Sequence, residues 1–282
     1  MAEYALGLYE KSMPETLSFS EKLEALSSAG FDYLELSIDE TDAKLERLDW
    51  SLAEIGRLRR VQEEAGVYIQ SMCLSGHRKY PLGHPSGEVR ARGLAIMRKA
   101  VRLAKLLGIR IIQLAGYDVY YEPSDEGTRN FFRDNIRVAA AMAAEEGVLL
   151  GFETMETPFM DTLRKALYWV ETVQSPYLKI YPDIGNMTNA AVLYQHSVSG
   201  DLQRGAGNII AMHLKETKPG VYREVPYGEG HVDFRQAVEQ AFSLGVRMFV
   251  AEFWHKGEEH WREILRENNR FLRSFLNPCA SC

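Results

Sequence analysis

Short apolar runs alternate with longer amphipathic stretches along the whole chain. Eight of these runs are nearly continuous in hydrophobicity, and several are rich in Ile, Val, Tyr or Phe, which is typical of parallel strands buried on both faces. We therefore predict strands at residues 4–9, 33–38, 67–74, 110–115, 148–153, 178–183, 209–214 and 248–253.

A helical pattern of apolar positions follows each predicted strand. Glycine stands directly after three of these stretches, at positions 66, 108 and 147, and glycine is the residue expected just past the end of a helix. The predicted helices span residues 18–28, 52–65, 87–107, 129–146, 161–173, 192–204, 234–243 and 258–275.

Eight strand–helix units in 282 residues predict an α/β protein built as one (β/α)8 TIM barrel. We expect a single domain over residues 1–276 and a flexible C-terminal tail at 277–282. The alternative is an open, doubly wound sheet, which usually carries a glycine-rich phosphate loop after its first strand. The first predicted strand leads instead into Glu-Lys-Ser-Met-Pro at 10–14, so the barrel is favoured.

Composition narrows the class of protein further. The chain is 46% hydrophobic and 26% charged, with a formal charge of −6, which is ordinary for a globular protein and argues against duplex-DNA binding. No apolar run reaches the length of about 18 residues that a membrane span needs. The N-terminal residues lack the basic and apolar regions of a signal peptide, so we expect a cytoplasmic protein with no nucleic-acid or membrane partner.

Four consecutive predicted strands end in residues that bind metal ions well. These are Glu153, Asp183, His213 and Glu252, spaced 30, 30 and 39 residues apart. A barrel has its active site at the C-terminal ends of its strands. A single carboxylate there is usually a helix cap or a surface charge, but three crowded together would repel one another without a cation. We predict a shared divalent-metal site, with Mn²⁺ favoured and Mg²⁺, Co²⁺ and Zn²⁺ as alternatives.

Short motifs near the predicted mouth extend this pattern over most of the chain. They are Gly-Leu-Tyr-Glu-Lys at 7–11, Ser-Met-Cys-Leu-Ser-Gly-His at 71–77, Gln-Leu-Ala-Gly-Tyr-Asp-Val-Tyr-Tyr at 113–121, Thr-Pro-Phe-Met at 157–160, Tyr-Pro-Asp-Ile-Gly-Asn at 181–186, Thr-Lys-Pro-Gly at 217–220 and Val-Pro-Tyr-Gly-Glu-Gly at 225–230. With them, the sequence resembles the sugar-phosphate 3-epimerases of the xylose-isomerase-like TIM barrels, specifically the L-ribulose-5-phosphate 3-epimerases.

This resemblance implies a metal-dependent enzyme that interconverts L-ribulose 5-phosphate and L-xylulose 5-phosphate, with a place in L-ascorbate or pentose catabolism. It implies that Glu153, Asp183, His213 and Glu252 hold the metal and that Glu153 and Glu252 are also the catalytic acid and base. No organic cofactor is implied. Epimerases of free ketoses commonly carry a His three residues after the Asp, and Asn186 stands there instead, which disfavours an unphosphorylated substrate.

The chemistry fits these residue types. Epimerisation at C3 of a 2-ketose removes a proton next to a carbonyl, and a cation can stabilise the cis-enediolate as a Lewis acid. Inversion needs a base on one face of the carbon and an acid on the other, which are the roles of the two Glu side chains. For binding the sugar phosphate, the candidates near the mouth are His77, Arg78, Glu156, Asn186, Lys215 and Glu229.

Three other functions compete with the epimerase. An aldose–ketose or hydroxypyruvate-type isomerase needs the same enediolate but moves the proton between C1 and C2, and a 3-epimerase of another ketose is a further variant. An apurinic-site endonuclease shares the fold superfamily but uses more His ligands and a DNA-binding face. A barrel that only binds ligands would not need four metal ligands. The sequence leaves the native metal, the configuration at C4 and a possible homodimer open.

Overall fold

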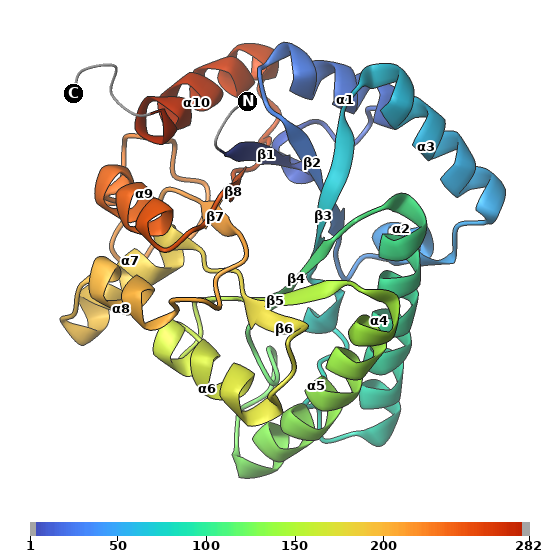
Figure 1. Cartoon of the computed structure of the whole chain (residues 1–282), viewed down its shortest axis with the longest axis vertical. Helices are drawn as coiled ribbons and strands as arrows, with labels where there is room; N and C mark the ends of the chain where they lie inside the picture. The colour runs from blue at the N-terminus through green and yellow to red at the C-terminus, as the bar shows by residue number, and fades with distance from the viewer. Residues whose placement is uncertain (1–3, 278–282) are drawn as a thin grey trace.

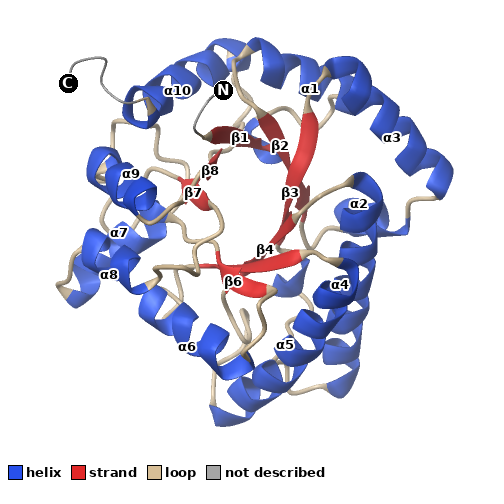
Figure 2. Cartoon of the chain, in the orientation of Figure 1, coloured by secondary structure: helices blue, strands red, loops and turns tan. Residues whose placement is uncertain are grey.

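A computed structural model describes residues 4–277, in which eight parallel strands form one sheet ringed by helices (Figures 1 and 2). Neighbouring strands follow the order β6-β5-β4-β3-β2-β1-β8-β7, with the first strand paired to both the second and the eighth. The strands are β1 (Ala5–Tyr9), β2 (Tyr33–Ile38), β3 (Tyr68–Leu74), β4 (Ile111–Ala115), β5 (Leu149–Glu153), β6 (Leu178–Ile180), β7 (Met212–Leu214) and β8 (Met248–Ala251).

The ring closes between β6 and β7 through single bridges. Ile180 pairs with Ile209, and Asp183 pairs with His213. The N–H of His213 donates to the carbonyl of Pro182 at 2.9 Å. This closure confirms the predicted TIM barrel and brings two of the predicted metal ligands side by side.

The helices pack outside this ring, and capping side chains define several of their starts. Ser18 and Ser51 each form a capping box with a Glu three residues later. The helices are α1 (Phe19–Ser28), α2 (Asp42–Leu45), α3 (Leu52–Ala65), α4 (Gly87–Leu107), α5 (Glu126–Glu146), α6 (Leu163–Val173), α7 (Ile184–Tyr194), α8 (Val198–Arg204), α9 (Phe234–Ser243) and α10 (Trp261–Leu276), with 3-10 turns η1 (Glu10–Ser12), η2 (Glu46–Asp49) and η3 (Gly76–Arg78).

Most predicted elements lie within three residues of the observed ones, but the region after β5 differs. The strands predicted at 178–183 and 209–214 are shorter, and the helix predicted at 192–204 is interrupted at residues 195–197. Two helices stand there, α7 and α8, separated by Gln195 in the left-handed conformation and by the N-cap Ser197. The first eight residues of α7 are buried, so this helix has no polar face that the periodicity of the sequence would reveal.

Successive side chains of each strand point to opposite faces of the sheet, and this alternation separates two apolar clusters. Leu34, Leu36 and Ile38 of β2 point outward and belong to the large core between the sheet and the helices. Tyr9, Tyr33 and other residues of the smaller cluster fill the inside of the barrel. The inside also holds buried polar side chains, which lie toward the C-terminal ends of the strands, where the candidate site forms.

The last described residue, Asn277, contacts a residue near the N-terminus. Asn277 begins the predicted tail, and its side chain accepts a hydrogen bond from Tyr4 at 2.7 Å. The rest of that tail, 278–282, lies outside the described residues. Among the helices of residues 4–277, none combines the length and the hydropathy required to cross a bilayer.

A buried ion cluster joins the start of η1 to the elements around it. Glu10 accepts hydrogen bonds from Lys22 Nζ at 2.7 Å, Lys44 Nζ at 3.2 Å and both terminal nitrogens of Arg47 at 2.7 and 2.8 Å. Burial alone would raise the pKa of Glu10, but Arg47 and the two lysines hold that pKa far below its usual range. One carboxylate therefore neutralises part of the charge of two buried lysines and the partly buried Arg47.

We expect Glu10→Gln to lower the free energy of unfolding by about 3–5 kcal/mol at pH 7, because it leaves buried cations without a counter-charge. A carboxylate with a depressed pKa contributes stability above its unfolded pKa of about 4.3 and loses that contribution as the pH falls. The difference between wild type and variant should therefore shrink in acid. Urea denaturation at pH 7 and at acidic pH measures both effects.

Glu15→Gln is the matched control for this prediction. The Glu15 carboxylate also lies 3.5 Å from Lys44 Nζ, but its side chain is 78% exposed. An exposed pair of this kind contributes about 0–1 kcal/mol. Equal losses of stability in the two variants would contradict the role assigned to burial.

Candidate metal centre and active site

The four predicted ligands come together at the mouth of the barrel. Glu153 is the last residue of β5, Asp183 is the N-cap of α7, His213 lies in β7, and Glu252 follows β8 directly. All four side chains are buried, and one ligand atom from each lies within 4.8 Å of the others. The spacing along the sequence thus translates into one compact cluster of three carboxylates and an imidazole.

His213 is the centre of this cluster. Its Nδ1 lies 3.3 Å from Glu153 Oε1 and 3.2 Å from Glu252 Oε2. Its other ring nitrogen, Nε2, faces Glu35 Oε1 at 2.6 Å. Nδ1 is therefore the nitrogen that His213 presents to the cluster.

Asp183 shows how the cluster fits a cation. Its Oδ1 accepts a hydrogen bond from the backbone N–H of Asn186 at 2.6 Å and lies 3.3 Å from Lys215 Nζ. Its Oδ2 is buried and has no hydrogen-bond partner. A buried carboxylate oxygen without a donor is unfavourable unless a cation binds it. The orphaned oxygen and the oxygen-rich donor set both fit a hard or borderline divalent metal ion.

The start of α7 holds Asp183 in place through a close backbone contact. A side chain at Gly185 would bring its Cβ to 2.7 Å from Thr217 Cγ2 and 2.8 Å from the Lys215 carbonyl oxygen. Glycine at this position lets α7 approach the segment after β7. The helix can then start directly at the ligand.

The carboxylates differ in their electrostatic environment. Burial and the nearby Glu252 raise the pKa of Glu153, and burial raises the pKa of Asp183 well above its usual range. Burial would also raise the pKa of Glu252, but Lys215 and His213 outweigh burial and lower it. Two carboxylates whose pKa values move in opposite directions are suited to acid and base roles.

His213 and Lys215 are the two basic groups of the cluster. Burial favours their neutral forms, but Glu35 and Glu252 raise the pKa of His213, while Asp183 and Glu252 raise that of Lys215. Lys215 lies 3.6 Å from Glu252 Oε2 and thus contacts two of the candidate ligands. A dication and Lys215 together would balance the three carboxylates.

A cavity of about 110 Å³ opens onto these side chains. Four of the predicted substrate-binding residues line it: Arg78, Glu156, Asn186 and Lys215. The sequence motifs contain Lys11 but do not single it out, and Lys11 lines the cavity together with Tyr9 and Trp254. Lys11 lies within the turn η1, and a lysine in a turn resembles an ordinary surface charge at the level of sequence.

The structure positions His77 and Glu229 away from the cavity, which corrects their predicted location. His77 is buried, and its Nε2 lies 3.1 Å from the carbonyl of Gly93 in α4. Burial lowers the pKa of His77 to about 4, so the ring offers no positive charge to a phosphate near neutral pH. Glu229 is exposed on the loop after β7, with its carboxylate 3.9 Å from Lys218.

Three loops meet over the cavity through Glu156. Its Oε1 accepts hydrogen bonds from Tyr120 OH and from Arg223 NH2, both at 3.1 Å. Arg78 packs over the Tyr120 ring at 4.7 Å from its centroid, and the Arg78 Nε is buried without a hydrogen-bond partner. The loops after β3, β4, β5 and β7 are thereby connected at the mouth.

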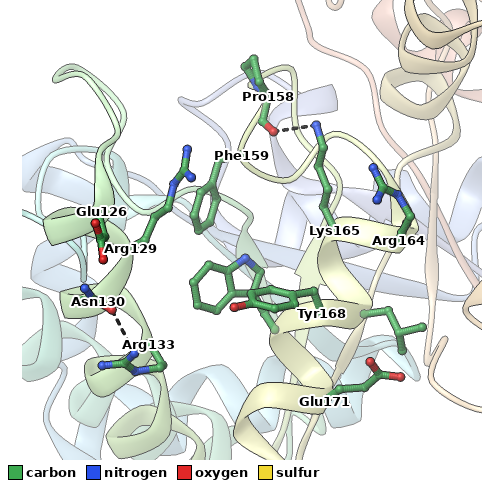
Figure 3. A pocket seen from close by; sticks show the side chains of 12 residues that line it. Glu126, Arg129, Asn130, Arg133, Pro158, Phe159, Arg164, Lys165, Tyr168 and Glu171 are labelled. Carbon is green, nitrogen blue, oxygen red and sulfur yellow. Dashed lines mark hydrogen bonds between the residues drawn. The ribbon is translucent and has the colours of Figure 1, made fainter.

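A larger cavity, of about 730 Å³, lies outside the barrel between α5 and α6 (Figure 3). Arg129 and Arg133 from α5 face Arg164, Lys165 and Tyr168 from α6 across it. Lys165 Nζ donates to the Pro158 carbonyl at 2.7 Å, as drawn in the same view. None of the predicted site residues lines this cavity. Substitutions of its charged residues can therefore serve as controls in tests of the site at the mouth.

Glu35 is the functional candidate that the sequence analysis missed. It lies in β2, is fully buried, and contacts His213 from inside the barrel. The only available signal was one acidic residue inside a mostly apolar strand, Tyr-Leu-Glu-Leu-Ser-Ile. Nothing in the sequence connects that residue to a histidine 178 positions away.

Comparisons with known proteins agree with this fold. The family model of the xylose isomerase-like TIM barrel matches residues 23–275. L-ribulose-5-phosphate 3-epimerase UlaE from Salmonella paratyphi A is 44% identical over 256 residues, which cover 90% of this chain and 89% of that protein.

Two solved structures share the fold at low sequence identity. D-psicose 3-epimerase from Clostridium cellulolyticum, with D-tagatose, has a TM-score of 0.80 at 17% identity and covers 97% of this chain and 100% of its own. A xylose isomerase-like TIM barrel protein from Mycobacterium smegmatis, in complex with magnesium, has a TM-score of 0.70 at 18% identity and covers 98% and 100%. The chain therefore belongs to the xylose isomerase-like TIM barrel family and is an enzyme of the isomerase class, related to sugar epimerases.

Proposed function

We propose that this enzyme is a divalent-metal-dependent 3-epimerase that interconverts L-ribulose 5-phosphate and L-xylulose 5-phosphate. The observation that carries the proposal is the position of Glu153 and Glu252, which approach His213 Nδ1 from β5 and from the end of β8. These strands are the outer two of four consecutive barrel strands, and both carboxylates line the cavity. The 44% identity to a protein named for this reaction supports the choice of substrate.

The proposed reaction moves one proton at C3. A divalent cation held by Glu153, Asp183, His213 and Glu252 would supply Lewis acidity toward the ketone and its neighbouring hydroxyl. One Glu takes the C3 proton on one face of the substrate, and the other Glu delivers a proton to the opposite face. Mn²⁺ is our preferred ion, and the magnesium complex of the M. smegmatis neighbour makes Mg²⁺ the first alternative.

Asn186 and Lys215 are suited to hold substrate oxygens. Asn186 is fixed by a hydrogen bond from its Nδ2 to the Thr154 carbonyl at 2.8 Å, and its Oδ1 is buried without a partner. That oxygen can accept from a sugar hydroxyl at the edge of the cavity. The Lys215 ammonium can donate to an oxygen that gains charge during proton removal.

The phosphate requires cationic donors, and we propose Arg78 for this role. Its Nε is a buried donor without a partner, and its guanidinium lies over the Tyr120 ring. Arg223 and Lys11 also line the cavity, but each already lies beside a carboxylate, Glu156 and Asp39 respectively.

We expect Arg78→Met to raise KM for the phosphorylated substrate by about 10- to 100-fold, which corresponds to the loss of charge-assisted hydrogen bonds. The kcat should change less, because the guanidinium does not touch the reacting carbon. Steady-state kinetics measures both constants. Arg164→Met, in the outer α5–α6 cavity, is the control and should leave KM unchanged. An equal rise in KM in both variants would mean that overall charge, rather than a contact of Arg78, attracts the substrate.

Hydrogen exchange tests the reaction itself. The purified enzyme is incubated with Mn²⁺ and L-ribulose 5-phosphate in D₂O, and the C3 proton is followed by NMR. We expect the C3–H signal to disappear while L-xylulose 5-phosphate accumulates. Exchange at C1 would indicate the aldose–ketose isomerase instead. A metal-loaded enzyme that exchanges neither position would refute the proposed substrate.

The proposal also covers the binding partner, the cellular compartment and the oligomeric state. The partner is a small sugar phosphate, and neither nucleic acid nor membrane takes part. We propose the cytoplasm as the compartment, because a phosphorylated sugar is charged and stays on the side of a bilayer where it is made. We also propose a homodimer, which size-exclusion chromatography with light scattering would test.

A further inference from the structure

Glu35 occupies an unusual place for an acidic residue. It lies in the middle of β2 on the inner side of the barrel, and its side chain has no solvent exposure. A buried carboxylate is costly unless hydrogen bonds satisfy both of its oxygens. The contacts of Glu35 meet that condition and also point to a function.

Three donors surround the carboxylate. Oε1 faces His213 Nε2 at 2.6 Å, while Oε2 accepts hydrogen bonds from Ser71 Oγ at 2.7 Å and Tyr181 OH at 2.8 Å. The Ser71 and Tyr181 hydroxyls fix one oxygen of Glu35, so the other oxygen is held toward the imidazole. The His213 ring is further confined by Tyr181, whose ring centroid lies 4.9 Å away.

This arrangement decides which nitrogen of His213 is available. A proton on Nε2 donates to Glu35, and the lone pair of Nδ1 then points at Glu153 and Glu252. A carboxylate behind a histidine fixes the tautomer and orientation of the ring and increases its strength as a ligand. With Nδ1 protonated instead, the ring would offer an N–H to the cluster and could not bind a cation.

We propose that Glu35 is a positioning residue for the metal centre: it holds His213 as the Nε2–H tautomer with Nδ1 directed at the metal site, and thereby sets metal affinity. The inference rests on the proposed metal dependence of this site. It adds a fifth residue to the machinery, one that acts through His213 and touches neither substrate nor metal.

Metal affinity tests the proposal without any assay of activity. We would titrate the metal-free protein with Mn²⁺ by calorimetry and compare wild type with Glu35→Met and Glu35→Gln. Methionine has a similar length, but its thioether sulfur is only a weak acceptor for the hydrogen bond of Nε2–H and carries no charge. We expect its Kd for Mn²⁺ to rise about 10- to 100-fold, in line with other partners of metal-bound histidines. Glutamine still offers a carbonyl oxygen and should recover part of that loss.

Ser71→Ala is the matched control, because it removes only one of the two hydroxyls on Oε2, while Tyr181 still holds that oxygen and Oε1 still faces His213. It should leave the Kd within about threefold of wild type, a difference below 1 kcal/mol. A purely structural role for Glu35 predicts a lower Tm of the metal-free protein with an unchanged Kd, and that result would overturn the proposal. An equal loss of affinity in Ser71→Ala would do the same.

A measurement on the wild type covers the case in which the variants do not fold. NMR of the Zn²⁺-loaded protein labelled with ¹⁵N-histidine reports the tautomer of His213 directly. We expect a protonated Nε2 and a metal-bound Nδ1, and the reverse assignment would refute the proposal. If the variants lose Mn²⁺ affinity while the wild type fails to epimerise pentulose phosphates, the role of Glu35 stands and the proposed substrate falls.

Discussion

Glu153→Gln and Glu252→Gln are each expected to lower kcat for C3 epimerisation by about 10²–10⁴-fold, the range found when a general acid or base is removed. Both side chains lie at the cavity and beside His213, so each substitution also removes a charged candidate ligand from the metal centre. Kinetics must therefore be measured at saturating Mn²⁺, with bound metal determined in the same samples.

Isotope exchange distinguishes two bases on opposite faces from a single base. If each Glu serves one face, a variant lacking one of them still removes the C3 proton from the epimer that faces the remaining Glu. We expect each variant to exchange C3–H with D₂O for one epimer only, and the two variants to prefer opposite epimers. Retention of exchange with the same epimer in both variants would contradict the two-base scheme.

Glu156→Gln provides the comparison for these variants. Glu156 lies three residues after Glu153 and lines the same cavity, but its carboxylate pairs with Arg223 instead of His213. We expect its kcat to remain within about tenfold of wild type, well outside the range for loss of an acid or base. A loss as large as that of Glu153→Gln would show that the general charge of the cavity governs the rate.

Removal of the metal is expected to have the second large effect, a loss of at least about 100-fold in activity, because the Lewis acid that stabilises the enediolate is gone. Metal present at about 100 times its Kd adds about 2.7 kcal/mol to the stability of the folded state. The Tm should therefore fall after chelation and recover when a divalent ion is added.

Chelation followed by metal analysis and reconstitution checks this prediction. Mn²⁺, Mg²⁺, Co²⁺ and Zn²⁺ are added separately, and activity and Tm are compared. Acid should weaken reconstitution, because protons compete with the cation for Asp183, Glu153 and His213, whose pKa values are all raised. Full activity in protein shown to be free of metal would contradict the proposed centre.

The sequence predicted the barrel and the four clustered residues because both depend on repetition. Each buried strand is a compact apolar run, and the fold aligns the strand ends, so ligands spaced by one unit must meet. Glu153, Asp183, His213 and Glu252 meet in the structure as this argument requires. The cluster needed no knowledge of how individual side chains turn.

The features that the sequence did not predict correctly depend on contacts between distant residues. The α7 helix was missed because it is buried on all sides at its start, and its Gly and Asn residues are poor helix formers. His77 lies just after the C-terminal end of β3, but its ring turns toward α4 and contacts the Gly93 carbonyl. Glu35 is visible only once the barrel brings β2 opposite β7, because its partners are Ser71, Tyr181 and His213.

The bridge between Glu156 and Arg223 has a consequence for substrate entry. The cavity of about 110 Å³ beneath it is small beside the roughly 300 Å³ at the lower end of ligand pockets, so the loops must separate to admit a pentulose phosphate. Arg223 is 42% exposed, and an ion pair in contact with water contributes only about 0–1 kcal/mol. Breaking this ion pair therefore costs little free energy, and a substrate that contacts both loops would favour their closed arrangement.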